Sequence, residues 1–156
     1  MVSKNQMTGM LGVYLVAAEL SRRGFIVSPT SRSAAGADLL VTDQKCQKAW
    51  SVQVKTNNKS ANFWLVGAKA KEIISDSHMY VFVNVGHGER AEYIVVPSTH
   101  VAEKVVHEKS KTGSEWYSFM RSDRPVAGEG WELFCDPHRG AGTTDNTNAI
   151  QKGDEA

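Results

Sequence analysis

The chain has 156 residues, of which 41% are hydrophobic and 22% charged, and its formal net charge is +1. These values are typical of an ordinary soluble globular protein of one domain. No apolar run reaches the roughly 18–20 residues that a membrane-spanning helix needs. The two cysteines, Cys46 and Cys135, are too few for a disulfide framework and lack the spacing of a metal site.

The charges are distributed unevenly along the chain. Residues 1–71 contain ten Lys or Arg and three acids, a net charge of +7, whereas residues 72–156 contain eight basic and fourteen acidic residues, a net charge of −6. A basic half is typical of proteins that bind polyanions, although surface charges also cluster by chance. Two of the three acids in the basic half, Glu19 and Asp38, are candidates for one site.

The first predicted element is a helix over residues 6–24. Leu11, Leu15 and Ala18 recur at helical spacing, and Gly24 provides a C-cap after two arginines. Its apolar run resembles a signal peptide, but only one lysine precedes it. We therefore expect a cytoplasmic protein.

Three strands follow the helix, over residues 25–30, 37–43 and 48–56. The second and third are joined by a short polar loop, which predicts an antiparallel hairpin. Residues 57–64 look like a loop, but Phe63–Val66 also has the composition of a short strand, and both alternatives stay open.

The second half of the chain contains further predicted elements. In chain order they are a helix over 68–76, a strand over 79–85, a strand over 91–97, and a helix over 98–109 with Ser98 as its N-cap. Residues 136–156 contain almost no large apolar side chain, so we expect one domain over 1–135 followed by a disordered tail. The order of elements indicates a mixed α/β (α+β) fold with helices flanking one sheet.

The strand over 48–56 has two chemically different faces. Side chains alternate along a strand, so Ser51, Gln53 and Lys55 share one face, opposite Val52 and Val54. Gln53 and Lys55 then stand about 6.6 Å apart and point the same way. If the preceding strand pairs antiparallel, the carboxylate at its start lies beside this amide and this ammonium group.

These oxygen atoms are suitable ligands for a hard cation. Asp38, the side-chain oxygen of Gln53 and nearby backbone carbonyls would hold Mg²⁺, with Mn²⁺ as a possible substitute. The ion would polarise a phosphodiester and lower the pKa of a bound water. Lys55 would stabilise the developing charge or orient the water, and Glu19 would bind the metal through water or transfer a proton.

The pattern resembles the PD-(D/E)XK nuclease superfamily, whose restriction-endonuclease-like fold has an αβββαβ core. The resemblance covers about residues 11–96 and rests on Glu19, on Asp38 in "GADLLV", and on Gln53 and Lys55 in "SVQVKT". It implies that Glu19, Asp38 and Lys55 are the helix acid, the metal-binding aspartate and the catalytic lysine. Gln53 replaces the usual Asp or Glu, as in the branch that contains a homing endonuclease and resolvase-like relatives, and this neutral ligand implies weaker metal binding or a single ion.

The leading hypothesis is therefore a metal-dependent DNA endonuclease. Two-strand cleavage needs two sites, so we expect a homodimer or a higher homo-oligomer. The preferred DNA contacts are Ser31, Arg32 and Lys59, which flank the strands that carry the site. One alternative is a nuclease-fold module that binds DNA or assembles without cleaving it, and another is a nuclease directed at RNA or nucleotides.

The histidines do not form a metal set, since His100 and His107 lie seven residues apart.

Overall fold

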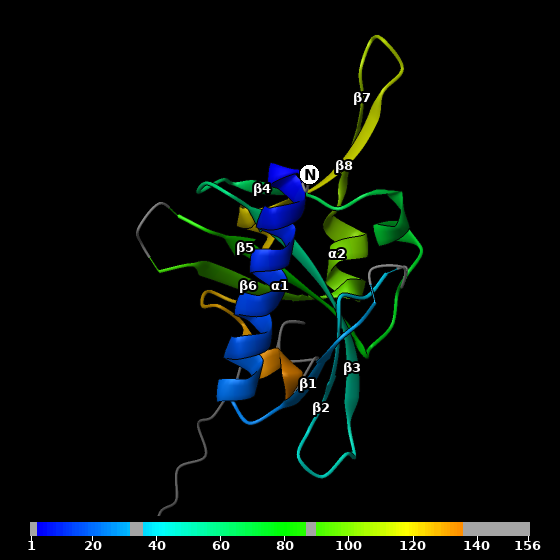
Figure 1. Ribbon diagram of the computed structural model, residues 1–156. Coiled ribbons are helices and arrows are strands. Elements are labelled where there is room, and N and C mark those ends of the chain that lie inside the picture. The colour runs from blue at the N-terminus through cyan, green and yellow to red at the C-terminus, as the bar shows by residue number, and fades with distance from the viewer. Residues whose placement is uncertain (1–2, 32–35, 87–89, 136–156) are drawn as a thin grey trace, which may run out of the picture.

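A computed structural model describes residues 3–31, 36–86 and 90–135 (Figure 1). Arg32 and the predicted tail over 136–156 lie outside the described residues. The predicted single domain and its boundary near residue 135 stay predictions.

The centre of the molecule is a mixed sheet of five strands in the order β1-β2-β3-β5-β6. The predicted hairpin is confirmed, because β2 and β3 pair antiparallel with Leu39 opposite Val52. Only β3 and β5 are parallel; the other neighbours in this sheet are antiparallel. The strands are β1 (Ile26–Pro29), β2 (Leu39–Thr42), β3 (Ala49–Asn57), β5 (His78–Asn84) and β6 (Glu92–Pro97).

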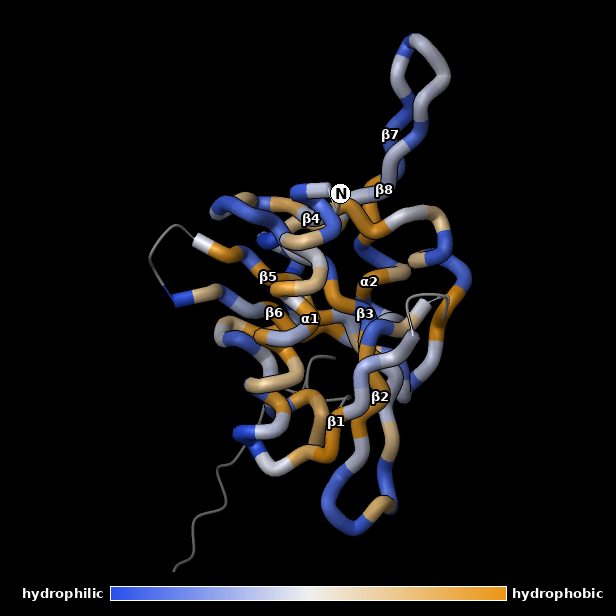
Figure 2. Tube along the Cα trace, in the orientation of Figure 1, coloured by the Kyte–Doolittle hydropathy of each residue, from blue (hydrophilic) through white to orange (hydrophobic). Residues whose placement is uncertain are grey.

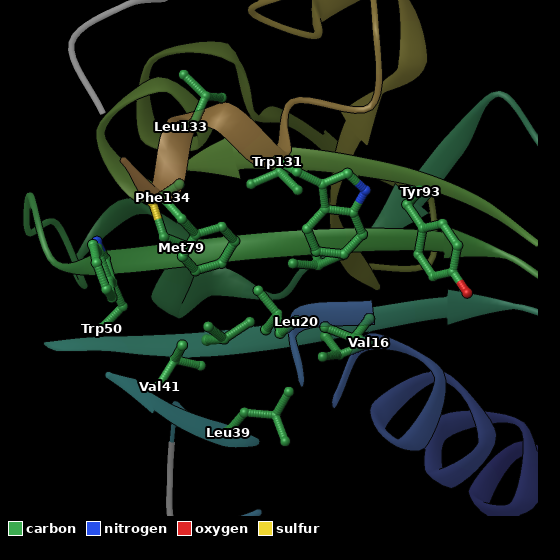
Figure 3. Close-up of a cluster of buried hydrophobic side chains, with 14 of the residues drawn as sticks. Val16, Leu20, Leu39, Val41, Trp50, Met79, Tyr93, Trp131, Leu133 and Phe134 are labelled. Atoms are coloured by element: carbon green, nitrogen blue, oxygen red, sulfur yellow. The ribbon is translucent and has the colours of Figure 1, made fainter. Parts of the chain in front are cut away.

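One face of this sheet is covered by the helix α1 (Lys4–Arg22) and by the 3₁₀ turn η3 (Trp131–Phe134). Ser3 and Gln6 cap the start of α1 reciprocally, each side chain bonding the other's backbone N–H. Figure 3 shows Val16 and Leu20 of α1 meeting Trp131 and the sheet residues in one hydrophobic cluster.

The opposite face is covered by a second, three-stranded sheet and by the short helix α2 (Ser98–Lys104). This sheet has the order β4-β8-β7, formed by β4 (Phe63–Leu65), β8 (Glu115–Met120) and β7 (Val106–Lys109). Its buried Phe119 stacks on Phe82 of β5 at 4.8 Å between ring centroids. The hydrophobic segments therefore gather in the middle layers, as Figure 2 shows, with polar residues along the outer loops.

The structure corrects the predicted core-facing stripe of the first helix. Leu11 and Ala18 are exposed, and the buried positions of α1 are Gly12, Val16 and Leu20. The observed stripe is shifted by one or two residues because α1 packs against Thr56 of β3 through Gly12, a residue type that a hydrophobicity pattern does not mark as buried.

The second predicted helix is reduced to the 3₁₀ turn η1 (Ala68–Lys71). Ala70 is the only buried residue of this turn, and Ile74 is exposed, so a longer helix would gain little from burial. The segment just after it is instead tied to α2 by hydrogen bonds between the backbone of Ser75 and the Ser98 hydroxyl.

The third predicted helix is also shorter than expected, because α2 ends at Lys104 and the chain continues as β7. Ser98 is the first helical residue and not the N-cap, which is Pro97. Its hydroxyl is buried and bonds Ser75. The alternative left open for Phe63–Val66 is decided in favour of a strand, β4, because Trp64 is buried against the sheet.

The contact between Gly12 and Thr56 yields the first prediction. A Cβ atom at Gly12 would lie 1.8 Å from Thr56 Oγ1 and 2.9 Å from its Cβ, whereas a Cβ at Gly9 would meet nothing within 4 Å. We expect Gly12→Ala to lower the free energy of unfolding by about 1–3 kcal/mol through overpacking. Gly9→Ala should raise it by up to about 1 kcal/mol, because alanine favours the helix.

Urea unfolding of the two variants measures both effects. If Gly12→Ala were as stable as Gly9→Ala, α1 would not pack closely on β3 at this point.

The buried His78 yields the second prediction. Its Nδ1 bonds the Ser51 hydroxyl at 2.7 Å, and its Nε2 is buried without a hydrogen-bond partner among the described residues. Burial lowers the pKa of His78. Below about pH 6.5 the unfolded chain therefore binds a proton that the folded chain does not. The free energy of unfolding consequently decreases as the pH is lowered.

We expect the free energy of unfolding to decrease between pH 7 and pH 5, with His78 contributing up to about 1.4 kcal/mol per pH unit. In His78→Phe this slope should be shallower, as measured by urea unfolding at each pH. Identical slopes in the two proteins would contradict the prediction.

Candidate active site

Asp38 lies where β2 leaves β3. Its backbone N–H donates to Val52 at 2.7 Å and its carbonyl accepts from Thr30 at 2.9 Å, so the backbone is held on both sides. Its carboxylate Oδ2 accepts from the Val54 backbone N–H at 2.8 Å and from Gln53 Nε2 at 2.6 Å. The carboxylate therefore accepts the hydrogen bond that a backbone carbonyl of β2 would accept if the pairing with β3 continued. This bond to the β3 backbone holds the carboxylate in position.

Gln53 and Lys55 lie on the face of β3 that the alternation predicts. Val52 and Val54 are buried on the opposite face, while Gln53 and Lys55 are partly exposed. The predicted contact between the Asp38 carboxylate and the Gln53 amide is confirmed. The amide presents its nitrogen to the carboxylate, so a cation shared by the two residues requires the amide to turn its Oε1 inward.

Two opposing effects act on the Lys55 ammonium group. Burial lowers the pKa of Lys55, and the nearby negative charge of Asp38 raises it in part. The first effect is the larger one, so the charged form is less stable here than in water. Lys55 is thus a lysine with a lowered pKa that lies near the Asp38 carboxylate.

The structure does not bring Glu19 to Asp38. Its carboxylate Oε2 bonds Arg22 at 2.9 Å and Arg23 at 3.4 Å, and the hydrogen bond from Arg22 is the main reason that the pKa of Glu19 is lowered. Val13, which lies six positions before Glu19 in α1, lines a pocket together with Asp38. Six residues turn a helix by about 600° and advance it by about 9 Å, so the two side chains point in different directions.

A pocket of about 350 Å³ lies between the first half of α1, the end of β1 and Asp38. Asp38 is the only acid among the described residues that line it, so α1 brings no carboxylate to this side of the site. Ser31 was expected from the sequence as a DNA contact, whereas the contribution of α1 to the pocket was not expected. The described lining residues are Gln6, Gly9, Met10, Val13, Tyr14, Pro29, Thr30, Ser31, Asp38 and Val54.

The spacing of residues in the first half of α1 could have predicted which of them line the pocket. Gln6, Met10 and Val13 recur at spacings of four and three residues, so they share one face of α1. Of the other predicted DNA contacts, Lys59 is exposed in the connection between β3 and β4, and Arg32 lies outside the described residues.

The donor set suits a hard cation but is sparse. Within residues 3–31, 36–86 and 90–135, no group of three or more His, Cys, Asp or Glu side chains is arranged to hold a metal ion. An ion at this site would be held by Asp38, by Gln53 Oε1 after the amide turns, and by backbone carbonyls and water. Mg²⁺ is commonly held in this way, by one or two carboxylates with the remaining positions filled by water and substrate.

No protein-family model and no curated protein matches this sequence. A solved structure does match, the Holliday junction resolvase Hjc of the archaeal hyperthermophile Archaeoglobus fulgidus, with a TM-score of 0.52 and 14% sequence identity. The match covers 81% of this chain and 95% of the resolvase. This chain has the resolvase fold. The mixed α+β architecture is thus the expected restriction-endonuclease-like one, although the helix predicted between β3 and β5 is replaced by β4 and η1. In the part of the chain that the structure describes, no helix combines the length and hydrophobicity needed to cross a bilayer.

The desolvated Lys55 yields a third prediction. We expect Lys55→Met to raise the free energy of unfolding by about 1 kcal/mol at pH 7, because a partly buried charge is removed while its apolar stem is retained. The lowered pKa of Lys55 means that the unfolded chain binds more protons between this value and about 10.5. The difference in the free energy of unfolding between Lys55→Met and the wild type should therefore shrink as the pH rises through this window.

Thermal unfolding of both proteins from pH 7 to pH 10.5 measures the difference. A Lys55→Met variant that is less stable than the wild type at pH 7 would show that Asp38 more than compensates for burial.

Proposed function

We propose that this protein is a metal-dependent DNA endonuclease whose site consists of Asp38, Gln53 and Lys55. The observation that carries the proposal is the hydrogen bond between the Asp38 carboxylate and the Gln53 amide, two residues before Lys55 on one strand face. The similarity of this fold to that of a Holliday junction resolvase supports the proposal. Fold alone does not define chemistry, so the roles of the residues are argued from the site.

Each residue of the site has a distinct role. Asp38 supplies the anionic ligand of a divalent cation, and Gln53 adds a neutral oxygen. When bound, the cation supplies Lewis-acid activation of the scissile phosphate and of the attacking water. Lys55 donates hydrogen bonds to the phosphate oxygens, where negative charge develops as water attacks phosphorus and the P–O bond to the leaving oxygen breaks.

Glu19 is left out of this catalytic set. Its carboxylate is engaged by Arg22 and Arg23 and faces away from the Asp38 pocket, so we assign it a structural role at the end of α1. Ser31 at the pocket and Lys59 near the end of β3 remain the proposed DNA contacts among the described residues. Cleavage of both strands would require a homodimer, which we propose as the active form.

The alternative is a DNA-binding module with this fold but without cleavage. The neutral Gln53 favours it, since the amide nitrogen already satisfies the carboxylate that would bind a cation. Competition between this hydrogen bond and the metal predicts a weak metal site.

Cleavage of supercoiled plasmid and of branched DNA tests the proposal. Wild type, Lys55→Met and Asp38→Asn are compared with Mg²⁺, Mn²⁺ and EDTA. We expect metal-dependent cleavage in the wild type and a loss of about 100-fold or more in both variants, because each removes charge stabilisation or a ligand.

Glu19→Gln is the matched control, because it also removes a charge, and we expect it to cleave at nearly the wild-type rate. If it lost activity as completely as Lys55→Met while remaining folded, Glu19 would belong to the catalytic set. Equal background in every protein, with DNA binding intact, would favour the binding module.

A further inference from the structure

The hairpin formed by β7 and β8 extends away from the body of the molecule, as Figure 1 shows. All four residues of β7 are exposed, and so are Glu115 and Trp116 at the start of β8. Among the described residues, no other helix or strand pairs with β7. Such a ribbon buries little hydrophobic surface, so core formation does not explain its length.

Cross-strand contacts stiffen this ribbon on both faces. The ring of His107 stacks on Tyr117 at 4.3 Å, Lys109 pairs with Glu115 at 3.3 Å, and the indole N–H of Trp116 donates to Glu108 at 2.8 Å. A two-stranded hairpin is only marginally stable by itself in water, and pairs of this kind are what stabilise one. The ribbon is thus a preformed arm.

The base and the tip of the arm are also held. At the base, Phe119 stacks on Phe82 in the core and the Lys71 ammonium group lies 5.7 Å from the Tyr117 ring centroid. At the tip, the backbone N–H of Ser110 donates to the Ser114 carbonyl at 2.8 Å, and the Ser114 N–H donates to the Ser110 hydroxyl at 3.0 Å.

We propose that this arm enters the major groove of a DNA duplex while the Asp38 site engages the backbone, an inference that rests on the proposed function. The four paired residues of β7 span about 13 Å, and the major groove is about 12 Å wide and 8.5 Å deep, wide enough for a two-stranded ribbon. The deep, narrow major groove of duplex RNA would not admit it.

The chemistry of the arm suits recognition of DNA. Its two acids are both occupied, Glu115 by Lys109 and His107, and Glu108 by the indole of Trp116. Lys111 at the tip has no ion pair within the described part of the chain, and Thr112 beside it is exposed. Lysine and hydroxyl groups are donors and acceptors for base edges and phosphates.

The arm and the candidate active site lie at the same end of the molecule. β8 pairs with β4, which follows the end of β3 that carries Lys55, and Asn57 bonds the Phe63 carbonyl there. Figure 1 shows the arm projecting beyond the end at which α1 begins, and the first half of α1 lines the Asp38 pocket. In the proposed complex, one duplex contacts both.

A shortened variant tests the proposal. Replacing residues 109–115 by Asn-Gly joins Glu108 to Trp116, which face each other in the ladder, through a favoured two-residue turn. The pairing of β4 with β8 and the buried Phe119 are retained. We expect at least a tenfold rise in the dissociation constant for duplex DNA in fluorescence anisotropy, with an unchanged Mg²⁺ affinity in calorimetry. The salt dependence of binding should also fall by about one ion, since Lys111 is removed as an unpaired cation whereas Lys109 is removed together with its partner Glu115.

Lys111→Ala is the single-residue test, and Lys45→Ala is its matched control. Both lysines are exposed loop residues without an ion pair among the described residues, but Lys45 lies in the β2–β3 loop at the other end of the molecule. We expect Lys111→Ala to weaken DNA binding about two- to fivefold and Lys45→Ala to leave it unchanged. Equal effects would overturn the proposal.

Photo-crosslinking identifies the groove. A duplex with 5-iodouracil in place of thymine presents the reactive atom in the major groove, where the C5 substituent lies. We expect mass spectrometry to find crosslinks in residues 106–117, with Trp116 as the preferred acceptor. Crosslinks only elsewhere, or a shortened variant that binds and cleaves DNA as well as the wild type does, would overturn the inference but leave the endonuclease. Wild-type protein that neither binds nor cleaves any DNA would instead refute the proposed function.

Discussion

β3 must satisfy two different environments, because its side chains alternate between the two faces of the central sheet. Trp50, Val52 and Val54 are buried on the α1 side, whereas Gln53 and Lys55 stay partly exposed on the other. This strand also pairs antiparallel with β2 on one side and parallel with β5 on the other. The buried face holds the strand in register, and the register places the polar face at the sheet edge where β2 departs.

The end of the pairing between β2 and β3 determines the hydrogen bonds of the Asp38 carboxylate. Because the strand pairing ends at this residue, a backbone N–H of β3 is left without a carbonyl and is satisfied by the carboxylate instead. The same oxygen accepts from the Gln53 amide, so the acid and the amide are held against each other by the end of the strand pairing. Lys55 is positioned at the cost of partial burial, and functional sites commonly retain such locally unfavourable groups.

Much of this arrangement follows from local patterns in the sequence. The strand alternation predicts the shared face of Gln53 and Lys55, and the hairpin predicts the contact between Asp38 and Gln53. The position of Glu19 was not predictable in this way. The helix stripe was assigned from Leu11, Leu15 and Ala18, whereas α1 packs through Gly12, Val16 and Leu20. Glu19 pairs with Arg22 and Arg23, three and four residues later at the same end of the helix.

The sequence by itself determined the order of the main strands, the two faces of β3 and the contact between Asp38 and Gln53. Each of these depends on neighbours in the chain or on the repeat of a strand. Only the tertiary structure decided that the Asp38 pocket is lined by the first half of α1 and not by Glu19, that two predicted helices are short, and that the hairpin of β7 and β8 projects from the body of the molecule. These features depend on contacts between segments far apart in the chain, such as Gly12 with Thr56 and Ser75 with Ser98, and no local pattern encodes such contacts.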